Sequence, residues 1–216
     1  MKKFLSLVIV VVFVITLTTG CSNENDNPVL VLNIKSEQFG IEGTVEIEMY
    51  PDKAPNTVKN IIYLANEGFY DGIQVSMVRP GKLVEIGDPK NIQLGGVRYA
   101  IKGEFKDNGF TQNDIKFERG IVAMSRYKQS YDSAVGDFFI QLDDTDQYDG
   151  KYAAFGRVIK GLELLDEISR VKNVGGALGY EPVFVIKVES TYLKLKGKQY
   201  DEPKRHMREH YGANKG

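Results

Sequence analysis

The residues best suited to chemistry lie between positions 133 and 156, where adjacent aromatic side chains border an acidic, turn-rich loop. Phe138-Phe139-Ile140 and Tyr152-Ala153-Ala154-Phe155 are short apolar runs typical of strands, and the loop between them closes on Asp149-Gly150, a strong turn signal. Neighbouring residues of a strand point to opposite faces of the sheet, so one phenylalanine enters the core and the other faces outward. The outward ring either forms an apolar platform for a ligand or is covered by a second layer of structure.

Other groups of reactive side chains form weaker patterns. His206 and His210 have the i, i+4 spacing of a metal pair on a helix, but no third ligand is near them in sequence, which favours solvated tail positions. Asp143, Asp144 and Asp146 are spaced like calcium ligands without the glycine and closing glutamate of that motif, which favours a solvated loop. The chain contains no GxxxxGK[ST], HExxH or GxSxG pattern, and we predict neither a metal nor a cofactor.

The elements that position these residues follow from the hydrophobic pattern. Residues 29–34 and 43–49 are predicted strands, and in the second the apolar residues alternate with glutamates, as expected of a strand with one buried face. A helix is predicted to begin at Pro55 and to end at Gly68, because proline suits the first turn and glycine the C-terminal end. Its inward face consists of Val58, Ile61, Ile62 and Ala65.

The second half of the chain predicts one more helix and a final strand. Residues 162–170 form the helix, with Leu162, Leu165 and Ile168 facing the core, and residues 183–195 form the last strand. The rest is a series of short apolar runs separated by Asp-Gly, Gly-Gly and Asn-Gly turn signals. This pattern is typical of an all-β sandwich or barrel.

The N-terminus predicts export and a lipid anchor. Lys2 and Lys3 precede an apolar run over residues 4–17, which is shorter than the ~20 residues of a membrane span and fits a secretory signal peptide. Residues 18–21, Thr-Thr-Gly-Cys, resemble a lipobox, in which the cysteine is acylated and becomes the mature N-terminus, although the leucine of that pattern lies one position early. Cys21 is the single cysteine, so an internal disulfide is excluded. An uncleaved anchor and an ordinary signal peptide are the alternatives.

The predicted organisation has four parts. They are a signal peptide (1–20), a lipidated N-terminus with a polar tether (21–28), one globular domain (29–195) and a basic tail (196–216). The chain has 28 basic and 29 acidic residues, a balance that gives no indication of a nucleic-acid partner. The tail either is a disordered, solvated extension or contacts anionic lipid or wall polymer near the anchor.

Short motifs spread over residues 29–189 carry a resemblance to a known family. They are Pro51-Asp52-Lys53-Ala54-Pro55, Glu67-Gly68-Phe69-Tyr70-Asp71-Gly72, Pro80-Gly81, Gly87-Asp88-Pro89, Gly120-Ile121-Val122-Ala123-Met124-Ser125, Ser133-Ala134, Phe138-Phe139-Ile140, Asp149-Gly150 and Phe155-Gly156. In this order they resemble the cyclophilin family of peptidyl-prolyl cis-trans isomerases. The resemblance implies a mainly β fold, a closed eight-stranded antiparallel barrel capped by two helices, that acts on proline-containing polypeptides.

The resemblance also implies a particular chemistry and a set of site residues. Rotation about an Xaa-Pro bond meets a barrier of ~18–20 kcal/mol that comes from amide resonance, and it requires no nucleophile. It requires a dry pocket for the proline ring, donors for the carbonyl oxygen and a positive group near the imide nitrogen. The substrate-binding positions implied for this chain are Leu83 and Phe139 on the apolar side, Ser125 and Arg126 beside the substrate backbone, and Tyr148 and Tyr152 at the pocket wall.

Several implied site positions carry changed residues. The catalytic arginine of the family falls on Met77, a pocket phenylalanine on Lys82, and two glutamines on Glu85 and Asp137. Loss of one preorganised charge-stabilising donor costs about 3–4 kcal/mol, or 10²- to 10³-fold in rate. The sequence therefore predicts a weakened enzyme.

Two arginines are candidates to replace the missing cation. Arg79 lies two residues after Met77, hence on the same strand face, and it either reaches the pocket or pairs with surface carboxylates. Arg126 either pairs with Glu85 and Asp137, which relieves the repulsion between these two carboxylates, or does not pair with them. In the second case the two carboxylates give the site a preference for basic peptide segments.

Two functions compete at this point. The first is a monomeric prolyl isomerase, exported and anchored on the extracytoplasmic side of the cell membrane, that assists protein folding there. The second is a cyclophilin-like peptide-binding module or holdase with little catalysis, which the replaced arginine favours. A hydrolase using paired carboxylates has no motif in its support.

Overall fold

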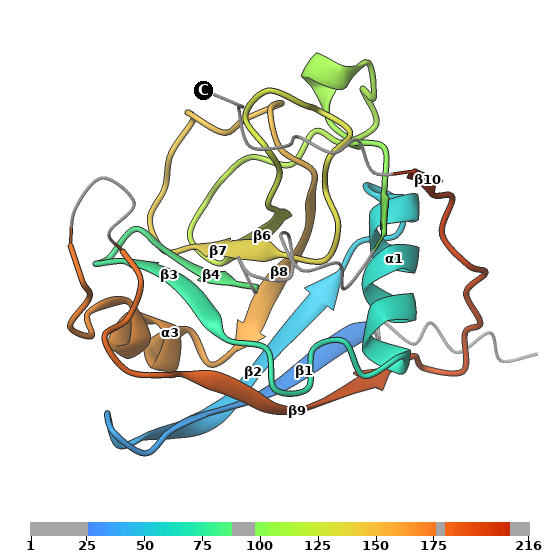
Figure 1. Ribbon diagram of the computed structural model, residues 1–216. Helices are drawn as coiled ribbons and strands as arrows, with labels where there is room; N and C mark the ends of the chain where they lie inside the picture. Colours follow the sequence, from blue (N-terminus) through green and yellow to red (C-terminus); the bar gives the residue numbers. More distant parts are fainter. Residues whose placement is uncertain (1–25, 88–97, 176–179, 208–216) are drawn as a thin grey trace, which may run out of the picture.

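One curled, eight-stranded antiparallel sheet forms the body of the protein in the computed structural model (Figure 1). The structure describes residues 26–87, 98–175 and 180–207. The strand order of the sheet is β3-β4-β7-β6-β8-β2-β1-β9. The strands are β1 (Val29–Ser36), β2 (Ile41–Met49), β3 (Val75–Arg79), β4 (Leu83–Ile86), β6 (Ile121–Met124), β7 (Phe138–Gln141), β8 (Ala154–Lys160) and β9 (Lys187–Lys194). The two strands predicted over residues 29–34 and 43–49 are confirmed as β1 and β2.

The barrel is nearly closed rather than fully closed. Between its outer strands β9 and β3, the described residues form one isolated bridge, Gln74 to Lys187, instead of a continuous ladder. The Val75 amide donates to the Ile186 carbonyl at 2.8 Å beside this bridge. Further along β3, the Val78 amide donates to the Tyr180 carbonyl at 2.7 Å. Complete closure was therefore an overstatement, because half of β3 pairs with an irregular segment in place of β9.

Two helices pack against the sheet, as predicted. Helix α1 (Pro55–Asn66) begins with the expected proline and lies against β9, and α3 (Leu162–Ser169) lies against β2, β3 and β4. The first turn of α1 has no cap from its own N-cap residue. Glu104 supplies one instead, because its carboxylate accepts from the amides of Asn56 and Thr57 at 3.0 and 2.8 Å. This bond satisfies amides that an isolated helix leaves without partners.

The main hydrophobic core lies on the concave side of the sheet. Phe138 and Phe155 are fully buried there, with ring centroids 5.9 Å apart in an edge-to-face arrangement. Tyr70 joins them, and its buried hydroxyl donates to the Gly136 carbonyl at 2.9 Å. Each such ring removes enough apolar surface from water to contribute about 1.5–3 kcal/mol. Phe138 is thus the inward member of the phenylalanine pair.

The C-terminal segment corrects two predictions. The final sheet strand is β9, shorter than the predicted 183–195, because the Val183 amide instead donates to the Lys172 carbonyl at 3.0 Å. Beyond it, β10 (His206–Met207) pairs with β5 (Tyr99–Ala100), so His206 lies in a strand and not in a helix. Up to residue 207 the tail is an ordered segment that contacts the domain, although most of its residues are exposed.

Aromatic side chains explain why this tail is held. The Arg205 guanidinium lies 4.0 Å from the ring centroid of Tyr63 on α1 and 4.7 Å from that of Tyr99 on β5. Lys59 of α1 binds Asp201 at 3.0 Å. The segment from residue 200 to 207 therefore runs along α1, as Figure 1 shows.

The predicted signal peptide, Cys21 and His210 lie outside the described residues. Within the described ranges, no helix is long and apolar enough to cross a membrane.

Candidate active site

The candidate site lies on the outer face of the sheet, opposite the core. Strand register places its side chains in two rows that run across β3, β4, β7 and β6. The first row is Met77, Glu85, Phe139 and Ala123, and the second is Arg79, Leu83 and Gln141. The intervening Val78, Val84 and Ile140 belong to the main core. Met77 and Arg79 therefore share a strand face, as predicted.

Phe139 is the centre of a second, aromatic cluster on this face. Its ring stacks on Phe117 with centroids 5.9 Å apart. The rings of Tyr148 and Tyr152 meet it edge-to-face, with centroids 5.5 and 5.4 Å away. Only 5% of Phe139 is exposed. Of the two sequence-based interpretations, the open platform is wrong for Phe139 itself, because loop aromatics form a partial second layer over it. Apolar surface reaches solvent through the half-buried Tyr148 and Tyr152.

Phe117 was missed by the sequence reasoning. It lies in a stretch without regular periodicity, and its one signal was an aromatic residue beside Ile115 in an otherwise polar loop. Asp149 fixes this loop, because its carboxylate accepts from the Phe117 amide and the Lys116 ammonium, both at 2.9 Å. The Asp149-Gly150 turn thus fixes the segment that places Phe117 against Phe139, as well as ending the loop.

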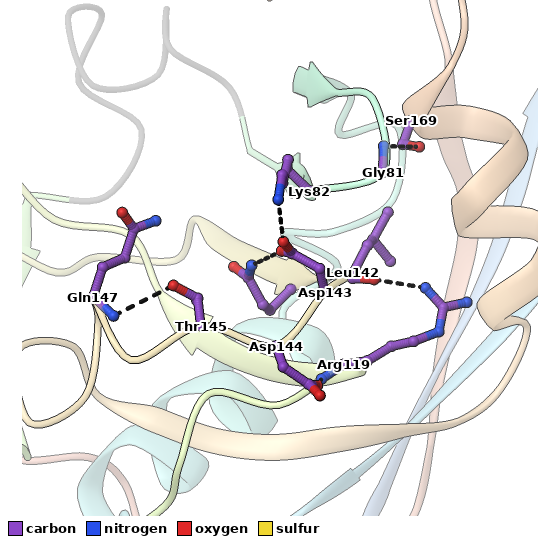
Figure 2. A network of polar contacts seen from close by, with 10 residues as sticks. Gly81, Lys82, Arg119, Leu142, Asp143, Asp144, Thr145, Gln147 and Ser169 are labelled. Atoms are coloured by element: carbon purple, nitrogen blue, oxygen red, sulfur yellow. Dashed lines mark hydrogen bonds and ion pairs between the residues drawn. The ribbon is translucent and has the colours of Figure 1, made fainter.

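A polar network holds the loop that leads to Tyr148, as Figure 2 shows. The backbone amide of Arg119 donates to the Asp144 carboxylate at 2.9 Å, and the Arg119 guanidinium donates to the Leu142 carbonyl at 2.8 Å. Lys82, exposed at the rim, forms an ion pair with Asp143 (Figure 2). Asp143 and Asp144 therefore bind protein groups, which removes the support for a calcium loop. Lys82 lies outside the apolar cluster.

Three polar groups border the cluster on the same face. Glu85, in the row of Phe139, is partly buried, and burial raises the pKa of its carboxyl group. The nearby Ser125 hydroxyl and the Arg79 charge act in the opposite direction on this pKa. The Arg79 charge also lowers the pKa of Tyr148, against a larger upward effect of burial. Arg79 is thus close enough to influence both the carboxylate and the aromatic wall.

Arg126 occupies a different place from the one expected. Its Nε and Nη2 donate to the Lys151 carbonyl at 3.1 and 2.9 Å. Its guanidinium lies over Tyr152 and Tyr131, 4.5 and 4.8 Å from the ring centroids. Backbone carbonyls and aromatic faces surround the cation, which argues against the alternative in which Arg126 pairs with Glu85 and Asp137. Arg126 links two loops behind the cluster.

Ser125 and Asp137 lie at the ends of neighbouring strands. The Ser125 amide donates to the Asp137 carbonyl at 2.9 Å, which continues the pairing of β6 with β7. The Asp137 side chain packs against Gly87, where an added Cβ would lie 2.5 Å from the carboxyl carbon. Glycine at position 87 thus makes room for Asp137.

The family comparison agrees with this architecture. The model of the family "Cyclophilin type peptidyl-prolyl cis-trans isomerase/CLD" matches residues 31–192. A peptidyl-prolyl cis-trans isomerase of Schizosaccharomyces pombe is 32% identical over 145 residues, which cover 67% of this chain and 91% of that protein. Peptidyl-prolyl cis-trans isomerase B of Bacillus subtilis is 37% identical over 125 residues, covering 58% and 82%.

The fold is also that of a solved relative. A cyclophilin-type isomerase of Cryptosporidium parvum, crystallised in the presence of the dipeptide Ala-Pro, superposes with a TM-score of 0.61 at 20% identity, covering 77% of this chain and 98% of that one. The fold and the outer-face site define a small β-barrel enzyme of the prolyl isomerase class. This chain belongs to the cyclophilin-type peptidyl-prolyl cis-trans isomerase family.

Proposed function

We propose that this protein is a weakened peptidyl-prolyl cis-trans isomerase that acts on polypeptides outside the cytoplasmic membrane, where a lipid on Cys21 anchors it. The observation that carries the catalytic part is the juxtaposition, on one sheet face, of the Phe139 cluster with Arg79, Glu85 and Ser125. A proline ring placed against Tyr148 and Tyr152 leaves its imide bond beside these polar groups. Family membership supports the same reaction.

The reaction requires only that the site favour the twisted amide. Twisting removes amide resonance, so the nitrogen becomes pyramidal and the carbonyl oxygen loses negative charge relative to the planar state. Binding accelerates rotation only where contacts are stronger in the twisted state than in the planar one. An apolar wall that holds the ring, with a cation beside the imide nitrogen, meets this requirement.

Met77 is the reason for proposing a lowered rate. It lies directly opposite Glu85 across β3 and β4, and its thioether provides no positive charge. Met77→Arg should raise kcat/KM on an Xaa-Pro peptide by up to about 10²- to 10³-fold. Because Glu85 lies opposite and can hold the new guanidinium, the double variant Met77→Arg, Glu85→Gln should exceed the single one.

The matched control for this experiment is Met207→Arg. Met207 is 82% exposed on β10, so this variant adds the same charge on another part of the surface. It should leave kcat/KM unchanged. If folded Met77→Arg gains no more than the control, the loss of charge at position 77 does not limit the rate.

A peptide-binding module without catalysis is the second candidate function. Met77 favours it, because the site then holds a proline segment without stabilising the twisted amide. This candidate predicts saturable binding of a proline peptide together with an unchanged isomerisation rate. Measuring both quantities on one preparation separates the two functions.

The anchor has a direct test. The basic start, the short apolar run and Gly20-Cys21 support a lipoprotein signal. Cys21→Ser should release the protein from membranes and abolish labelling by a fatty-acid analogue, whereas Ser22→Ala should change neither. Membrane association of Cys21→Ser with undiminished labelling would contradict the anchor.

A further inference from the structure

Arg79 is held in place without using all of its hydrogen-bonding capacity. Its guanidinium carbon lies 4.9 Å from the ring centroid of Tyr180, whose carbonyl accepts from the Val78 amide at 2.7 Å. The turn that follows is fixed as well, because the Lys82 amide donates to the Arg79 carbonyl at 2.9 Å. Planar guanidinium groups stack well on aromatic faces, so Tyr180 defines the side from which Arg79 extends.

Two buried polar atoms on this sheet face have no hydrogen-bond partner among the described residues. They are Nε of Arg79 and Oε1 of Gln141. Buried polar groups in native proteins are nearly always paired, so two unpaired atoms on one face require an explanation. One of them donates and the other accepts. A peptide backbone, which offers both carbonyl oxygens and amides, matches that pair.

The spacing of the strands fits such a ligand. β3 and β7 are separated by β4, so their backbones lie about 9–10 Å apart. Arg79 and Met77 border one side of this strip, and Phe139 and Gln141 border the other. One extended peptide lying above β4 would place its carbonyl groups between the guanidinium and the aromatic cluster.

We propose that Arg79 is the catalytic cation of this enzyme, that its Nε–H and guanidinium charge contact the Xaa-Pro amide, and that Tyr180 is a positioning residue for it. The inference rests on the proposed isomerase function. It accounts for residual catalysis in a site in which position 77 has no charge. No covalent bond forms or breaks, since Arg79 acts only on the charge distribution of the rotating amide.

The charged and titratable groups that act on this region are Glu85 on β4 and Tyr148 in the loop after β7, with Tyr180 against the outer side of β3. The Arg79 charge lowers the pKa of the Glu85 carboxyl group through space, so Glu85 partly balances the guanidinium charge. Arg79 therefore keeps an N–H available for substrate while its charge remains balanced.

The test compares variants of the full chain on an Xaa-Pro peptide. Arg79→Ala should lower kcat/KM by about 10- to 10³-fold, mainly through kcat, and Arg79→Lys should recover part of the loss by restoring charge without the planar fork. Tyr180→Phe keeps the aromatic face and should match wild type, whereas Tyr180→Ala should be several-fold slower. Arg170→Ala, which removes an exposed arginine, is the control and should behave as wild type.

A second measurement needs no substitution. Titration of the wild-type protein with the same peptide, followed by nitrogen-15 NMR, should shift the Nε–H resonance of Arg79. Folded Arg79→Ala with wild-type kcat/KM, or an unshifted resonance at saturating peptide, would overturn the assignment of Arg79 while leaving the isomerase function intact. A wild-type protein that does not exceed the uncatalysed rate would overturn both.

Discussion

Glu85 is a residue of the candidate site whose buried carboxylate destabilises the folded protein at neutral pH. It lies between Met77 and Phe139 in the same row across the sheet, and burial raises the pKa of its carboxyl group. A raised pKa means that the folded protein holds the proton more tightly than the unfolded chain does. The contribution of Glu85 to the free energy of unfolding is therefore most favourable below the pKa of the unfolded chain, about 4.3. It is lost as the pH rises through the higher pKa of the folded protein.

Glu85→Gln should accordingly stabilise the protein at neutral pH. The amide keeps the shape of the side chain and removes the buried negative charge. The midpoint of thermal unfolding should be higher than that of wild type at pH 7, and the difference should vanish below about pH 4, where both side chains are neutral. Glu181→Gln, at an exposed position, is the control. A lower midpoint for Glu85→Gln at pH 7 would contradict this account.

Phe138 and Phe139 lie on opposite faces of β7, and we expect the first to affect stability and the second to affect peptide binding. Phe138 is fully buried in the main core, and Phe139 belongs to the outer aromatic cluster. Phe138→Ala should cost about 3–5 kcal/mol of unfolding free energy, as core substitutions of this kind do. Phe139→Ala should leave a folded protein that binds proline peptides about 1–3 kcal/mol more weakly.

Denaturant unfolding and peptide titration of both variants check this division. Unchanged peptide affinity in folded Phe139→Ala would remove that residue from the site.

Among the elements, the regular ones were predictable and the connecting segments were not. Alternation identified β2, and apolar spacing identified α1 and α3, because each pattern reflects one buried face. Proline and glycine added the ends of α1. The positions of Phe117, Tyr180 and Arg126 could not be predicted in this way. Each depends on contacts between loops far apart in sequence, for which local periodicity has no signal.

The segment from residue 200 to 207 is an element that composition misjudged. Its basic residues suggested a disordered extension, yet Arg205 lies over Tyr63 and Tyr99. Each cation–π contact at a partly exposed site contributes about 0.5–1 kcal/mol. Arg205→Ala should therefore lower the unfolding free energy by about 1–2 kcal/mol, measured by urea denaturation. Arg98→Ala, at an exposed position, should have little effect, and equal stability of Arg205→Ala and wild type would show that the segment is not held by these contacts.

The whole molecule is a nearly closed barrel with its core inside and its candidate site on the outer face of four strands. The resemblance of short motifs identified this architecture correctly, since glycine turns and strand pairs recur in a fixed order. It placed Phe139, Tyr148 and Tyr152 together, and the structure brings them within one aromatic cluster. The motifs could not show that the Arg126 guanidinium donates to the Lys151 carbonyl and lies over the ring of Tyr152, because these contacts join loops that are apart in sequence.

The most direct test of this account is the rate of cis-trans isomerisation of a short Xaa-Pro peptide with the full-length protein, compared with the rate without it. We expect the wild-type protein to accelerate the reaction in proportion to its concentration, and Phe139→Ala to lose most of that acceleration while remaining folded. If the wild-type protein binds the peptide but leaves the rate at its uncatalysed value, the barrel is a peptide-binding module and the proposed catalytic function is wrong.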